Sequence, residues 1–215
     1  MLSLRLRSAL PVLVRAYSSR PASSFPSLNY PGLYFHPSSS SSSSYSLSFL
    51  PEPAPSLEFS PTTIGQLSSK PGQEREGEPE ILPRYFRENP QFLNLVHEVL
   101  RQEISKGDDW VESLAKSIVK GGVDTYIHLG DQRNPAEAQR TAQPQDIIAS
   151  ILVRGHTGQV IAESYEPNKV AYRVVSELGL MRLPDSLFEK LVHQCTNVRR
   201  VEVEIAQEKG RRGDE

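Results

Sequence analysis

The sequence has almost no cysteine and no long apolar run, and each absence excludes a class of protein. Cys195 is the single cysteine among 215 residues, which excludes an intramolecular disulfide framework and a zinc site built from several cysteines. No apolar stretch approaches the roughly 20 residues that a membrane-spanning helix needs, so we expect no transmembrane segment. The formal net charge of -2 also argues against broad binding to nucleic acid.

Acidic residues and prolines are unevenly distributed along the chain. The first acidic residue is Glu52, and 20 of the 26 acidic residues lie after residue 80. Of the 17 prolines, 13 lie within residues 1–90. The chain therefore divides into a proline-rich front and a back with the composition of a globular domain. We expect one folded domain over residues 81–206 and a charged tail over residues 207–215.

The first 17 residues have the composition of a mitochondrial transit peptide. They contain Arg5, Arg7 and Arg15 and no acidic residue, and leucines and valines lie between the arginines. Such a segment forms an amphipathic helix that is removed after import. Arg15 precedes a bond between Tyr17 and Ser18 that we expect a matrix protease to cleave. A secretory signal fits less well, because its positive charges would precede the apolar segment instead of interrupting it. We therefore expect the protein in the mitochondrial matrix.

Residues 18–80 have the composition of a disordered linker. Seven consecutive serines occupy residues 38–44, and prolines follow at residues 51, 53 and 55. Such a segment buries too little apolar surface to offset the entropy lost on ordering. We expect that a chain beginning near Ile81 folds without it.

Two helices are predicted at the start of the folded domain. Asn89 and Pro90 form a helix-start signal, with asparagine as N-cap and proline at the first helical position. Apolar residues then recur at helical spacing over residues 90–105. Asp108 or Asp109 caps a second helix that ends at the glycine pair 121–122. The short connection predicts a helical hairpin.

The spacing at which apolar residues recur then changes from the 3.6-residue period of a helix to the two-residue period of a strand. We expect strands over residues 123–129, 147–153, 160–165, 170–175 and 180–183, and a third helix that begins near Asp185. Residues 199–209 fit a strand or an extension of that helix. The predicted fold class is α+β: an N-terminal helical hairpin, an antiparallel meander of four to five strands and a C-terminal helix, preceded by a long disordered segment.

The loop over residues 130–145 is unusually long, and long loops in compact domains are often functional. Polar side chains gather at its two ends, and they are His128, Asp131, Arg133, Asn134 and Asp146. Such a corner can hold a general base and an anion-binding arginine. In the simpler interpretation, His128 lies on the solvent face and Arg133 pairs with an aspartate to fix the loop. We predict no metal and no cofactor.

Three functions remain open from these residues. The first is a non-enzymatic matrix accessory protein, an assembly, stability or ribosome-associated factor that contacts a mitochondrial protein partner of unknown identity. The second is a small matrix enzyme that uses the corner formed by His128, Asp131 and Arg133. The third, less favoured, is an RNA-associated factor whose Tyr126, Tyr165 and Tyr172 stack on bases. An enzyme is the less expected outcome, because the sequence contains no set of residues at a spacing characteristic of a catalytic site.

Overall fold

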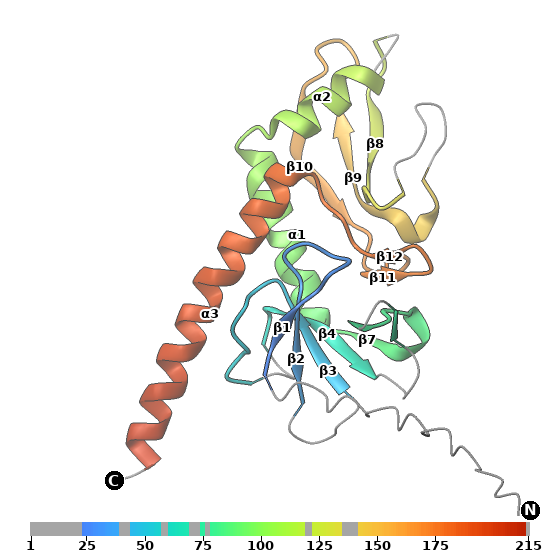
Figure 1. Ribbon diagram of the computed structural model, residues 1–215. Helices are drawn as coiled ribbons and strands as arrows, with labels where there is room; N and C mark the ends of the chain where they lie inside the picture. Colours follow the sequence, from blue (N-terminus) through green and yellow to red (C-terminus); the bar gives the residue numbers. More distant parts are fainter. Residues whose placement is uncertain are drawn as a thin grey trace, which may run out of the picture.

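The computed structural model describes residues 23–38, 44–56, 60–68, 74–75, 78–118, 122–134 and 142–213. Three α-helices and a set of antiparallel sheets make up this part of the chain (Figure 1). The predicted α+β class is therefore confirmed. The expected transit peptide and its cleavage site at Tyr17 and Ser18 lie outside the described residues.

A five-stranded antiparallel sheet forms where we expected a disordered linker. Its strand order is β1-β2-β3-β4-β7, and the strands are β1 (Phe25–Pro26), β2 (Tyr34–Pro37), β3 (Ser44–Ser48), β4 (Thr63–Ser68) and β7 (Phe86–Glu88). On one face of this sheet the Phe35 ring stacks on Phe25 at a centroid distance of 5.1 Å and meets Tyr45 edge-on at 5.8 Å. The linker prediction is thus wrong for the described part of residues 23–80.

The serines and prolines led to the prediction of a disordered linker. The positions that they occupy in the sheet are nevertheless compatible with strands. Ser48 is buried, and its hydroxyl donates a hydrogen bond to the carbonyl oxygen of Thr62 at 3.0 Å. Ser46 is buried and accepts a hydrogen bond from the Gln66 amide at 2.8 Å. Pro26 and Pro37 are the last residues of their strands, where a missing N–H costs little.

Short elements lie between strands β4 and β7 of this sheet. They are β5 (Glu74–Arg75), β6 (Glu78–Pro79) and the 3-10 helix η1 (Pro83–Tyr85). The buried Glu78 carboxylate accepts hydrogen bonds from the Ser27 hydroxyl, the Leu28 N–H and the Asn29 amide. This carboxylate therefore fixes the turn that follows β1.

Helices α1 (Pro90–Ser105) and α2 (Asp109–Ile118) lie where the sequence predicts them. The Asn89 side chain caps α1 by accepting from the Gln91 N–H at 3.0 Å. Asp108 caps α2 by accepting from two backbone N–H groups at 3.1 Å each. The predicted helical hairpin is not shown, because α1 packs mainly against α3, β10 and β4 whereas α2 packs against β8 and β10.

The second sheet has three antiparallel strands in the order β10-β9-β8. They are β8 (Thr125–Gly130), β9 (Ile147–Val153) and β10 (Val160–Pro167). The strands predicted over residues 170–175 and 180–183 do not join this sheet. A separate two-stranded hairpin of β11 (Val175–Ser176) and β12 (Gly179–Leu180) forms there instead. The carbonyl oxygen of Arg173 accepts a hydrogen bond from the Arg133 side chain, whereas that of Val174 accepts from both the Arg133 side chain and the Met181 N–H.

Helix α3 (Asp185–Gly213) has 29 residues, so residues 199–209 extend the helix and most of the expected charged tail belongs to it. Figure 1 shows that its C-terminal half projects away from both sheets. The buried Arg199 side chain anchors it to the N-terminal sheet through hydrogen bonds to Thr62 and to the carbonyl oxygen of Glu52. Beyond this anchor Val201 and Ile205 are about half exposed.

One continuous hydrophobic core joins both sheets and the helices. The ring of Phe49, next to β3, lies 6.0 Å from Phe92 of α1 and 4.9 Å from Phe188 of α3. The folded part therefore begins before residue 81. None of the helices in the described ranges is long and apolar enough to cross a bilayer.

Candidate functional site

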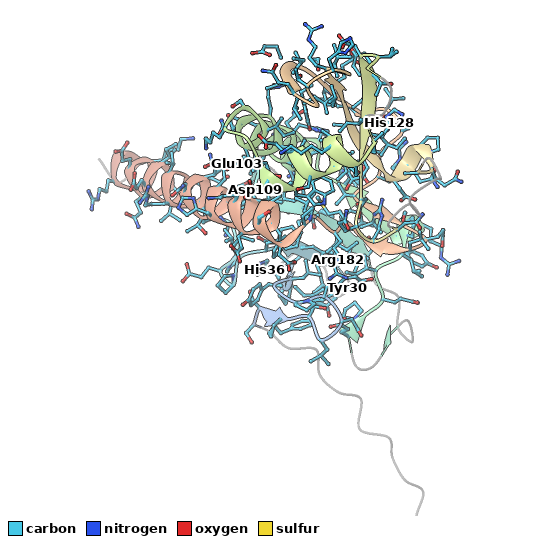
Figure 2. The ribbon with its side chains drawn as sticks, turned by 90° about the horizontal axis from the view of Figure 1, so that it is seen from above. Tyr30, His36, Glu103, Asp109, His128 and Arg182 are labelled. Atoms are coloured by element: carbon cyan, nitrogen blue, oxygen red, sulfur yellow. The ribbon has the colours of Figure 1, made fainter. Side chains whose placement is uncertain are left out.

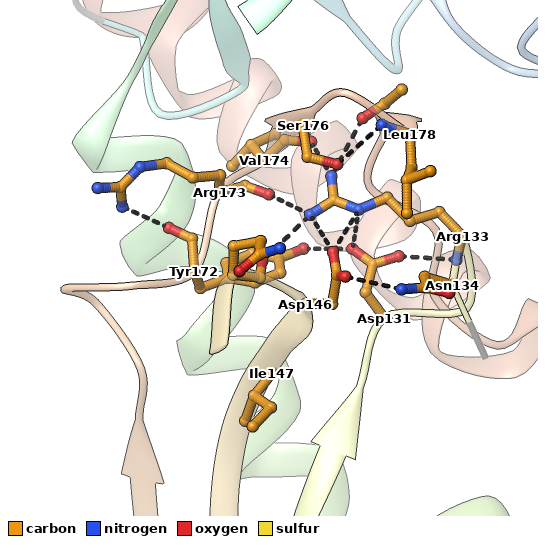
Figure 3. Close-up of polar contacts among 12 residues, drawn as sticks. Asp131, Arg133, Asn134, Asp146, Ile147, Tyr172, Arg173, Val174, Ser176 and Leu178 are labelled. Atoms are coloured by element: carbon orange, nitrogen blue, oxygen red, sulfur yellow. Dashed lines mark hydrogen bonds and ion pairs between the residues drawn. The ribbon is translucent and has the colours of Figure 1, made fainter. Parts of the chain in front are cut away.

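Four of the five predicted site residues come together at the end of β8. They lie on the segment after β8 and on the 3-10 helix η2 (Pro144–Asp146), as Figure 3 shows. Arg133 Nε lies 3.5 Å from Asp131 Oδ2 and donates to Asp146 Oδ1 at 3.3 Å. The Asn134 amide donates to Asp146 Oδ2 at 2.9 Å. The sequence thus predicted a real cluster, although residues 135–141 of the loop lie outside the described residues.

His128 does not belong to this cluster. Its ring is exposed on β8 (Figure 2), and its Nδ1 forms a hydrogen bond with the Ser150 hydroxyl at 2.9 Å across the β8–β9 pair. Alternate residues of a strand point to opposite faces, and the neighbouring Ile127 and Leu129 are buried. The cluster therefore lacks the histidine that the enzyme hypothesis needs as a general base.

Every N–H group of the Arg133 side chain has an acceptor. A guanidinium carries five N–H donors. Besides Nε, which donates to Asp146, Nη1 donates to the carbonyl oxygens of Val174 and Gly179 at 3.0 and 3.1 Å. Nη2 donates to the carbonyl oxygens of Arg173 and Gln145 at 2.6 and 3.3 Å. Because the side chain is only 3% exposed, no donor of Arg133 is left to bind an anionic ligand.

The two carboxylates of the cluster are occupied as well. Asp131 is buried and accepts hydrogen bonds from the backbone N–H groups of Arg133 and Arg182 at 2.9 Å each. The Tyr172 hydroxyl donates to its other oxygen at 2.8 Å. Burial raises the pKa of Asp131, whereas the positive charge of Arg133 opposes this rise. Burial also raises the pKa of Tyr172 well above its usual range, so this hydroxyl stays a hydrogen-bond donor.

The cluster holds the turn between β11 and β12 in place. Val174 and Gly179, whose carbonyl oxygens Arg133 binds, stand on either side of the turn residues Glu177 and Leu178. Gly179 has a φ of +99°, and a Cβ there would lie 2.5 Å from the Tyr30 hydroxyl oxygen, so this position favours glycine. The cluster therefore acts as a rigid support for a surface turn.

Sequence reasoning missed the partners of Arg133 because most of them are backbone carbonyl groups, which every residue carries. It also placed Tyr172 on a sheet face, whereas this residue is fully buried beneath Arg133. Tyr165 is buried too, and its hydroxyl forms a hydrogen bond with His97 Nδ1 at 2.8 Å. Of the three tyrosines expected to stack on bases only Tyr126 is exposed, so the predicted stacking surface is not formed.

Two hollows flank the turn that Arg133 supports. The first has a volume of about 530 Å³ and lies between β7 and β11, and the second has a volume of about 320 Å³ and lies beside the turn after β1. Glu177 and Leu178 line both hollows, and Leu178 is 57% exposed. The turn therefore presents an apolar side chain between two concave surfaces.

Comparisons of the chain with protein-family models, with curated protein sequences and with solved structures found no match.

Proposed function

We propose that the protein is a non-enzymatic accessory factor of the mitochondrial matrix that acts by binding another protein through the surface around Leu178. The observation that carries the proposal is the position of the exposed Leu178 on a turn whose flanking residues, Val174 and Gly179, both accept hydrogen bonds from the buried Arg133 side chain. Binding residues typically lie on loops that a rigid scaffold positions. The Arg-rich, acid-free N-terminus supports the matrix location.

A single exposed leucine is common on protein surfaces and needs no explanation by itself. Leu178 differs because apolar side chains line the hollows on both sides of it. They are Pro83, Phe86 and Val175 on one side and Pro79 and Ile81 on the other. A concave apolar surface around a protruding leucine suits a partner's side chains. The enzyme hypothesis has less support, because His128 lies apart from the aspartates and Arg133 has no free donor.

Affinity capture from mitochondrial matrix extract tests the proposal when it is made with matched variants. Val123 is 71% exposed and lies before β8, outside both hollows, so Val123→Ser is a control of similar exposure for Leu178→Ser. We expect a specific partner to be retained by the wild type and by Val123→Ser and lost by Leu178→Ser. A partner set that does not depend on Leu178 would contradict the proposal.

A further inference from the structure

We infer that the two hollows beside Leu178 together bind an extended cationic segment of the partner, in which arginine or lysine alternates with leucine or valine. The inference rests on the proposed function, because it names the chemistry of the partner that this surface takes. Three features of the surface support the inference: the apolar residues that line it, the sign of its charge and its rigidity.

Apolar side chains line part of both hollows. Phe86 and Val175 line the first hollow, and Ile81 and Leu82 line the second, with Leu178 between them. The volumes of about 530 and 320 Å³ are in the range of sites that enclose small ligands. Each hollow therefore has room for apolar side chains of a partner on either side of Leu178.

The rim of the surface is acidic. Glu177 lines both hollows, Glu88 lines the first and Glu80 lines the second. Glu80 and Glu177 are exposed. Among the described residues that line the hollows, Arg173 is the one cation, and its Nη1 donates to the carbonyl oxygens of Val170 and Tyr172. Opposite charges across an interface favour association, and like charges disfavour it. The surface therefore selects a cationic partner and disfavours a phosphate or a nucleic acid.

An extended segment matches this arrangement of apolar lining and acidic side chains. Successive side chains of an extended chain point to opposite sides, so alternate leucine or valine side chains can enter the hollows. Arginine and lysine have long flexible stems, and their charged ends can fold back along the segment to the carboxylates of Glu80 and Glu177. A divalent cation is a poorer match, because in the described ranges no three His, Cys, Asp and Glu side chains are placed to hold a metal ion.

The surface is ordered before a partner binds. Arg133 binds carbonyl oxygens on both sides of the turn, and the Leu178 N–H donates to the Ser176 hydroxyl at 3.2 Å. The Glu78 carboxylate, which lines the second hollow, holds the neighbouring turn at Ser27–Asn29. A preformed surface loses little conformational entropy on binding, so a short segment is sufficient to bind.

A peptide with the sequence of residues 1–20 is a suitable probe, because it contains four arginines and no acidic residue, with leucines and valines between them. The protein, tagged at its C-terminus and isolated from mitochondria, is titrated into the fluorescently labelled peptide, and binding is followed by anisotropy. The control peptide carries glutamate in place of each arginine. We expect the arginine peptide to bind and the glutamate peptide not to bind.

Variants of the protein locate the binding surface. We expect Leu178→Ser to weaken binding about tenfold, as loss of a central apolar contact does. Glu177→Lys is expected to weaken it about fivefold, with a smaller difference at about 0.5 M salt because screening shortens the reach of charges. Val123→Ser and Glu204→Lys, the latter on the exposed part of α3, are matched controls that leave the affinity unchanged.

Three results would overturn the inference: a dissociation constant above about 1 mM for the arginine peptide, equal binding of both peptides, or an affinity that Leu178→Ser and Glu177→Lys leave unchanged. The proposed function is tested separately by the matrix capture. If the captured partner depends on Leu178 while the arginine peptide does not bind, the inference is wrong and the proposed function stands. If the captured partner does not depend on Leu178, the proposed function fails as well.

Discussion

The Arg133 guanidinium donates a hydrogen bond to the carbonyl oxygen of Gly179, 46 residues further along the chain, at 3.1 Å. A residue with the sequence features of an anion-binding arginine therefore fixes the backbone of a distant turn. Its positive charge is offset by Asp131 and Asp146, and the turn that it supports carries the exposed Leu178.

Replacement of Arg133 is expected to destabilise the protein strongly. Arg133→Ala leaves two buried carboxylates without their cation, and breaking a buried ion pair from one side typically costs about 3–5 kcal/mol. Arg133→Lys is expected to recover little, because a lysine has three donors at one point and cannot reach five separated acceptors. Urea unfolding measures the free energy of unfolding, with Arg200→Ala, at an exposed arginine of α3, as the control. A loss below about 0.5 kcal/mol, as at ordinary surface positions, would show that the buried cluster is not structural.

Removal of residues 1–80 is expected to unfold the rest of the chain, contrary to the expectation from composition. The deletion removes β1 to β4 and exposes Phe92 and Phe188, which pack against Phe49. We expect such a chain to be insoluble, or to bind a dye for exposed apolar surface and lack a cooperative thermal transition. Removal of residues 1–22 is the matched control. Equal cooperative unfolding of both shortened chains would contradict the shared core.

The buried His97 is expected to make the protein less stable at acidic pH. Burial, with the positive charges of Lys169 and Arg101, lowers its pKa from 6.5 to about 4. The unfolded state then binds more protons than the folded state between these two values. The free energy of unfolding therefore falls as the pH decreases from about 6.5 to about 4, by at most about 3 kcal/mol at 1.36 kcal/mol per pKa unit.

The variant His97→Phe isolates this contribution. His97 Nε2 is buried without a hydrogen-bond partner, so an aromatic ring of similar size loses only the bond to the Tyr165 hydroxyl. We expect urea unfolding between pH 7.5 and pH 4.5 to show a smaller pH dependence in His97→Phe than in the wild type. His128→Gln, at an exposed histidine, should keep the wild-type slope. An unchanged slope in His97→Phe would rule out this source of the pH dependence.

The N-terminus of the protein isolated from mitochondria is expected at Ser18 or within about ten residues of it, since composition locates targeting segments approximately. Edman sequencing or mass spectrometry of the mature protein measures this position. Replacement of Arg5, Arg7 and Arg15 by glutamine is expected to reduce import, because the membrane potential then acts on fewer positive charges. Mature protein that retains Met1 inside mitochondria would contradict the processing prediction.

Elements with local signals could be predicted from the sequence. The cap at Asn89 and the apolar spacing after it predict α1 with its observed bounds, and the β-branched run at residues 147–153 coincides with β9. The grouping of Asp131, Arg133, Asn134 and Asp146 could also be predicted, because all four lie near the two ends of one loop. In each case the atoms that interact belong to residues close in sequence or joined by one hairpin.

The sequence by itself determined the α+β class, the bounds of α1, the starts of α2 and α3 and the presence of a charged cluster, since hydrophobic period and capping are local properties. The tertiary structure alone decided that strands β1 to β4 form a sheet, because strand pairing and a shared core stabilise segments whose composition favours disorder. It alone decided the role of Arg133. Four of its acceptors are backbone carbonyl oxygens, which carry no sequence signature, and only the folded chain brings them around one guanidinium.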